Sequence, residues 1–142
     1  MGLTERRKIK ELQDTTLPER VKEIEEICGK AIPYEVDWAS LEDDLQGLNF
    51  LDNLSCHRLN MALRTICIDD MGKEAVRESI NLIKLKNVST PADMQMTFEG
   101  GVLEMHCAYA QGTSGMHSDD DMRKLLLDKL WTGHMCSDKM RI

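Results

Sequence analysis

Residues 94–109 constrain the fold more than any other part of the sequence, because apolar and polar residues alternate there on both sides of Gly100-Gly101. Alternation with a period of two is typical of a β-strand with one buried face, and a Gly-Gly pair between two such runs predicts a hairpin turn. A slip of one residue would move every apolar side chain to the wrong face, so the register is well specified. The predicted apolar pairs are Phe98–Leu103, Met96–Met105 and Met94–Cys107.

Two other segments share this alternation. Ile83 and Leu85 alternate with lysines, which predicts a strand near 83–88, and the acidic-apolar pattern of 34–38 predicts a further short strand. We expect these strands to join the hairpin in a small antiparallel β-sheet. The outer face of that sheet would carry polar side chains, namely Lys84, Lys86, Gln95, Thr97, Glu99, Glu104 and His106.

Three helices are predicted in the N-terminal part of the chain. A charged segment, 4–13, predicts a short helix. Thr16-Leu17-Pro18-Glu19 has the form of a capping box, which predicts a separate second helix that ends at Gly29. Ser40, followed by three acids, predicts the start of another helix.

The longest helix is predicted over 48–68, with a buried stripe formed by Leu51, Leu54, Leu59, Met61, Ala62, Leu63 and Ile66. Ser118 is expected to cap a C-terminal helix packed on the sheet, with a stripe of Met122, Leu125, Leu126 and Leu130. The sequence therefore predicts an α+β fold. A length of 142 residues favours one domain, 1–142, in which 134–142 form a frayed tail.

The net charge of −7 is concentrated in the middle of the chain. Residues 31–72 hold eight acids and only two bases, Arg58 and Arg64. Phosphate binding needs clustered Lys and Arg, so nucleic acid is excluded as a partner, whereas a protein with a basic surface is favoured. The candidate interaction surface consists of Glu42, Asp43, Asp44, Glu104 and His106.

Several classes of protein are excluded by what the sequence lacks. It has no apolar run long enough to span a membrane and no secretory signal. Its five cysteines are scattered without a CxxC pair, which favours reduced thiols in the cytoplasm. His117, His134 and Cys136 lie in a predicted loop and tail without the spacing of a metal site, so neither a metal nor another cofactor is expected.

Two constellations remain as candidates for chemistry. His106 and Cys107 are adjacent on a strand, so they face opposite sides and cannot form a direct pair. On the long helix, Asn53, His57, Asn60 and Arg64 align in a polar stripe, which is typical either of a ligand-facing helix or of the solvated side of an amphipathic one.

Two functions from different classes follow. The first is a non-catalytic protein-interaction module that is acidic and cytoplasmic. An inhibitor or immunity-type role is compatible with this description. The alternative is a small enzyme whose site collects Glu104 and His106 with His117 or His57. An enzyme requires a concave pocket where at least two of these groups converge.

Overall fold

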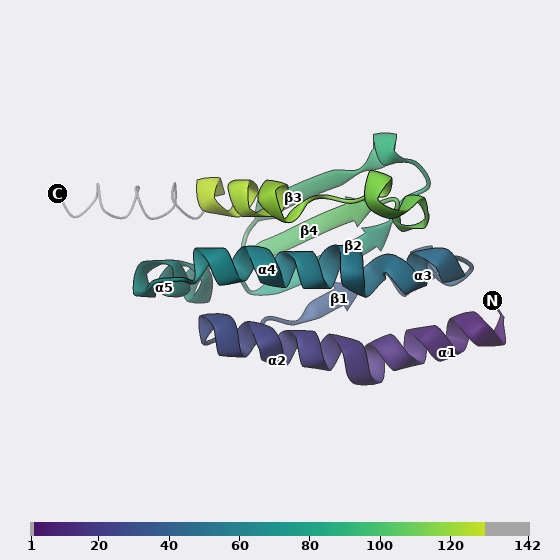
Figure 1. Ribbon diagram of the computed structural model, residues 1–142, viewed down its shortest axis with the longest axis horizontal. Helices are drawn as coiled ribbons and strands as arrows, with labels where there is room; N and C mark the ends of the chain where they lie inside the picture. Colours follow the sequence, from purple (N-terminus) through teal and green to yellow (C-terminus); the bar gives the residue numbers. More distant parts are fainter. Residues whose placement is uncertain (1, 130–142) are drawn as a thin grey trace.

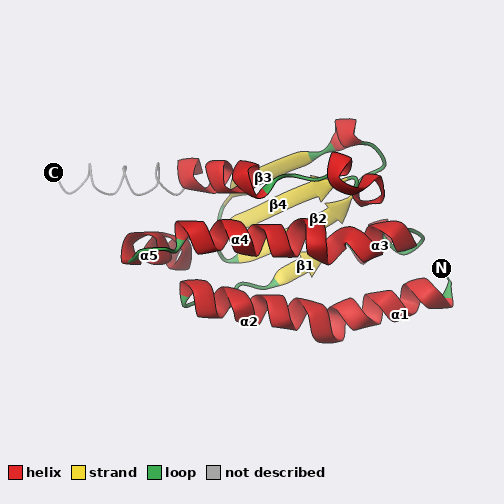
Figure 2. Ribbon diagram, in the orientation of Figure 1, coloured by secondary structure: helices red, strands yellow, loops and turns green. Residues whose placement is uncertain are grey.

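The computed structural model describes residues 2–129 and has two layers, with helices covering one face of a four-stranded sheet (Figures 1 and 2). This arrangement confirms the predicted α+β class. The helices are α1 (Leu3–Glu11), α2 (Leu17–Cys28), α3 (Leu45–Leu51), α4 (His57–Ile66), α5 (Asp70–Ser79) and a C-terminal helix over 119–129. The strands are β1 (Tyr34–Val36), β2 (Leu82–Asn87), β3 (Gln95–Glu99) and β4 (Val102–Cys107).

The hairpin register is as the alternation predicts. Phe98 pairs with Leu103 and Met96 pairs with Met105 across β3 and β4. Phe98, Leu103 and Met105 are buried under the helices. Met94 lies outside β3, so the expected pair with Cys107 is not formed.

The prediction of an antiparallel sheet is wrong outside the hairpin. The strand order is β1-β2-β4-β3, and β2 runs parallel to both β1 and β4. After β2 the chain passes through the turn Pro91–Asp93 to the sheet edge, where it forms β3. The hairpin then returns β4 into the space beside β2. Alternation reports which face a residue occupies and does not report strand direction.

The N-terminal helices form one continuous run. A π-helical turn, Leu12–Thr16, joins α1 to α2, and Thr16 is helical and makes no side-chain cap. The prediction of a separate capped helix is therefore wrong. Pro18 has no N–H, and its ring would press on the carbonyl four residues earlier in a regular helix. The wider turn, in which the Leu17 N–H bonds to the Leu12 carbonyl, relieves that contact.

The central helix is also continuous across a π-helical turn, Asp52–Cys56, between α3 and α4. It begins at Asp44, whose carboxylate accepts a hydrogen bond of 2.8 Å from the Gly47 N–H. Ser40 therefore does not start this helix, and its hydroxyl instead accepts a bond from the Asn87 N–H of β2.

Most of the predicted stripe on the central helix is buried, with Leu51, Leu59, Ala62, Leu63 and Ile66 in the core. Met61 is 43% exposed, so its assignment to the core is wrong. In the C-terminal helix, Met122 and Leu126 are buried, and the Ser118 hydroxyl caps the Asp121 N–H as expected. The predicted Leu130 contact and the tail 134–142 lie outside the described residues.

Candidate functional site

The face of the sheet turned away from the helices carries the polar residues that the alternation predicts. Glu35, Lys84, Glu104 and Thr97 form one row across the four strands. A shallow cavity of ≈ 390 Å³ lies over this face, lined in part by Glu35, Lys84 and Glu104. Acids and bases alternate along the row, so this open face is not uniformly acidic.

The residues of the enzyme hypothesis are only partly brought together. His106 Nε2 lies 2.5 Å from Glu104 Oε2 on the open face. His117 Nε2 bonds to the backbone oxygen of Gln95 in β3, at 2.9 Å. His57 is exposed on α4, which belongs to the helical layer that covers the other face of the sheet. One acid–histidine contact is therefore formed, and His57 lies apart from it.

The acidic segment predicted as an interaction surface follows β1. Asp44 caps α3 and accepts a bond of 3.1 Å from the Asn87 side chain, so its carboxylate has a structural use. Glu42 and Asp43 are exposed in the same turn. Asp37, at the end of β1, is exposed and its carboxylate accepts a bond from the Ser40 N–H.

The predicted polar stripe on the central helix is divided. Asn60 is buried, and Arg64 Nη2 lies 3.6 Å from Glu23 Oε2 of α2. Asn53 and His57 are exposed. The π-helical turn adds one residue between the two parts of the stripe, which rotates the earlier residues relative to the later ones. The spacing of an ideal α-helix therefore misplaces Asn53.

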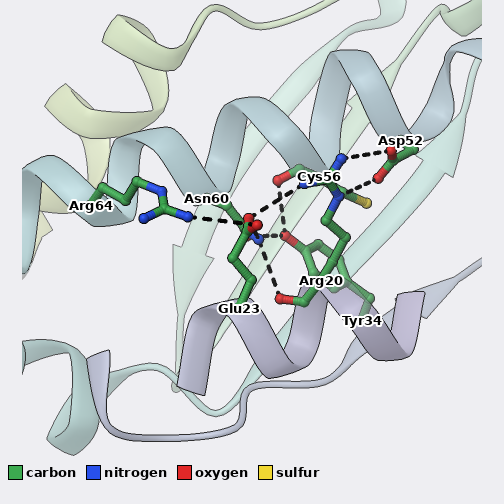
Figure 3. A network of polar contacts seen from close by, with 7 residues as sticks. All are labelled: Arg20, Glu23, Tyr34, Asp52, Cys56, Asn60 and Arg64. Carbon is green, nitrogen blue, oxygen red and sulfur yellow. Dashed lines mark hydrogen bonds and ion pairs between the residues drawn. The ribbon is translucent and has the colours of Figure 1, made fainter. Parts of the chain in front are cut away.

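Asn60 belongs to a polar network between α2, α4 and β1 that no local pattern in the sequence predicts (Figure 3). Its amide donates to Glu23 Oε1 at 2.7 Å and to the Arg20 carbonyl at 3.2 Å. The Tyr34 hydroxyl donates to Asn60 Oδ1 at 2.9 Å. Burial of the Tyr34 phenol raises its pKa well above the ordinary value.

Arg20 forms the other half of this network. Its Nε and Nη2 donate to the two carboxylate oxygens of Asp52 at 2.7 and 2.8 Å. This bidentate hydrogen bonding raises the pKa of Arg20. The pair joins α2 to the π-helical turn of the central helix. The two residues are separated by 32 positions, and no local pattern connects them.

An open groove of ≈ 810 Å³ lies between α2 and β1. Its walls are mostly apolar, and the lining residues are Gln13, Leu17, Pro18, Val21, Pro33, Tyr34, Glu35, Val36, Trp38 and Leu82. The polar network lies beside this groove, because Tyr34 contributes to both. Through Asn60 of α4, the network therefore connects the helix and the strand that form the two walls.

The strand wall of the groove has a free backbone edge. Among residues 2–129, β1 is the terminal strand of the sheet and is bonded to β2 on one side only. The Asp37 N–H donates to the Leu85 carbonyl, and the Pro33 carbonyl accepts from Ile83. Along a strand, the N–H and C=O groups of successive residues point to opposite sides. The N–H and C=O groups of Tyr34 and Val36 therefore point away from β2, toward the groove.

Comparisons with protein-family models, curated proteins and solved structures returned no match. In the part of the chain that the structure describes, no cluster of three or more His, Cys, Asp or Glu is placed to hold a metal ion. None of the helices within residues 2–129 is long and apolar enough to cross a membrane.

Proposed function

We propose that this protein is a non-catalytic protein-interaction module that binds an extended segment of a partner protein along the free edge of β1. The observation that carries the proposal is the position of an apolar groove beside unpaired strand backbone. An extended peptide added to a sheet edge gains main-chain hydrogen bonds from the strand, and pockets beside the strand select alternate side chains. Here the groove and the free backbone edge lie on the same side of β1, the side away from β2.

The charges around the groove favour a basic partner. Glu35 lines it, and Asp37, Glu42 and Asp43 follow β1 at one end. These acids attract a segment that carries Lys or Arg beside its apolar residues, and they disfavour nucleic acid. We place this interaction in the cytoplasm, where the thiols of the chain stay reduced in the absence of an oxidant.

A small enzyme is the second candidate, because Glu104 and His106 are in direct contact. A carboxylate beside an imidazole is the arrangement expected of a general base. Under this alternative, the open face of the sheet rather than the groove would bind the ligand. Replacement of Glu104 by Gln would then impair ligand binding or turnover, whereas it would leave peptide binding in the groove unchanged.

A selection from a displayed library of random peptides tests the proposal. We expect the selected sequences to alternate apolar residues and to carry a basic flank. Val21→Lys places a charge on the α2 wall of the groove and should weaken binding by about tenfold or more, a loss of at least 1.4 kcal/mol. Thr97→Lys introduces the same charge on the open face and is the matched control, with an expected change below about twofold. Binding that depends on Thr97 and not on Val21 would contradict the proposal, as would a selection that yields no binder.

A further inference from the structure

Two cysteines meet where the long helices end. α2 and α4 lie side by side and run in the same direction, so their carboxyl-terminal ends are neighbours (Figure 1). Cys28 is the last residue of α2 and Cys67 directly follows α4. Their sulfur atoms are 2.7 Å apart, and both are free thiols. A disulfide bond is about 2.05 Å long, so a small movement of the two side chains brings the sulfurs to bonding distance.

The surroundings distinguish the two thiols. The hydrogen bond between the two sulfurs, with the positive charges of Lys73 and Arg77 on α5, lowers the pKa of Cys67. The same two charges also act on Cys28, but there the hydrogen bond and burial outweigh them and raise the pKa. Cys67 is therefore the better nucleophile, because the thiolate is the reactive form, and Cys28 is in place to attack it afterwards.

We propose that Cys28 and Cys67 form a site of reversible oxidation that reacts with hydrogen peroxide and closes a disulfide between α2 and α4. Both residues are almost inaccessible, with exposed fractions of 0% and 4%, which favours a small oxidant over a bulky disulfide donor. The site is separate from the groove, so the proposal does not depend on the proposed function.

The reaction proceeds in two balanced steps. The Cys67 thiolate attacks one peroxide oxygen, the O–O bond breaks, and the products are a sulfenic acid and, after protonation of the leaving hydroxide, water. The Cys28 sulfur then attacks Cys67, the S–O bond breaks, and the thiol proton leaves with the hydroxide as a second water. In total, two thiols and one peroxide give one disulfide and two waters. A thiol reductant reverses the change.

The other described cysteines lack this arrangement. Cys56 and Cys107 are buried, and burial raises the pKa of each thiol. The Cys107 sulfur lies 3.9 Å from the Ser55 hydroxyl and has no thiol partner among the contacts of the described residues. Oxidation is therefore expected to select the Cys28–Cys67 pair.

The test is to treat the full chain with a small molar excess of hydrogen peroxide, block the remaining thiols and digest with trypsin. We expect the intact mass to fall by two hydrogen atoms, and peptide 23–30 to be joined to peptide 65–73 until a reductant is added. Cys28→Ser should abolish the cross-link, whereas Cys56→Ser should leave it unchanged.

Three results would overturn the proposal. The first is a cross-link that involves other cysteines. The second is oxidation of Cys67 to a sulfinic or sulfonic acid in the folded wild-type chain. The third is no mass change at all in that chain. Because the cross-link is mapped in the wild-type protein, the result does not depend on whether the serine variants fold.

Discussion

The Arg20–Asp52 ion pair is expected to hold α2 against the central helix, and Asp52→Ala tests this. The two side chains are 22% and 24% exposed and form two short hydrogen bonds. Loss of one partner costs about 3–5 kcal/mol in a fully buried pair and below about 1 kcal/mol in an exposed pair. Arg20 keeps a contact with Glu23 at 3.4 Å, so we expect an intermediate cost of about 2 kcal/mol.

This loss converts into a measurable melting temperature. An unfolding entropy of about 2.1 cal/mol/K per residue gives about 0.3 kcal/mol/K for 142 residues. Asp52→Ala should therefore lower Tm by about 7 °C. Glu11→Ala, which removes a contact of 3.6 Å between the exposed Glu11 and the partly exposed Lys8 on one helix, is the control and should cost below about 0.5 kcal/mol. Equal effects of the two substitutions would refute the reasoning, as would a coupling energy near zero in a double-mutant cycle with Arg20→Ala.

Other predictions concern the core and the titration of the chain. Phe98→Ala should lower the free energy of unfolding, measured in urea, by about 3 kcal/mol or more, because Phe98 is buried. Thr97 is exposed, so Thr97→Ala should cost below about 1 kcal/mol. Equal effects would mean that the buried and exposed faces of the hairpin are assigned wrongly. Closure of the proposed disulfide across 39 residues should stabilise the chain by about 4 kcal/mol in the chain-entropy model, which raises Tm by about 13 °C. A serine variant of either thiol should show no such rise with peroxide. Burial raises the pKa of Tyr34 and Tyr109, so the folded state keeps both phenols protonated above the unfolded pKa of about 10. The free energy of unfolding should therefore fall as pH rises above about 10, and tyrosinate absorbance should appear together with unfolding. A gradual rise of tyrosinate absorbance in the folded protein would contradict the assignment.

The hairpin was predictable because its information is local. Alternation identifies the buried face, and Gly100-Gly101 fixes the turn, so the register of β3 and β4 follows from the sequence alone. The position of β2 was not predictable in this way. The insertion of β4 between β2 and β3 depends on contacts distant in sequence, and a strand pattern is the same for parallel and antiparallel neighbours.

The π-helical turns explain the errors on the helices. A π turn has no strong sequence pattern, and Pro18 predicts a new helix because proline is common in a first turn. In the central helix, the extra residue at Asp52–Cys56 separates Asn53 from Asn60, although an ideal α-helix would align them. Ser40 and Asp44 are both good capping residues, and only the structure distinguishes them.

The candidate site was predicted only in part. The open face, with Glu104 and His106, follows from the strand alternation. The groove does not, because Val21 looks like a core residue on a helical stripe and Val36 like a core residue on a strand. Their places as two walls of one groove appear only when α2 and β1 are packed together.

Amide hydrogen exchange tests the central claim most directly, with and without a peptide selected on this protein. If the peptide adds a strand to β1, the amides of Tyr34 and Val36 should exchange about tenfold more slowly in the complex. The Asp37 amide, already bonded to Leu85, should change little, and so should the amides of β3. Protection at Tyr34 and Val36 would confirm the account. Unchanged exchange at both, with new protection along β3, would contradict it.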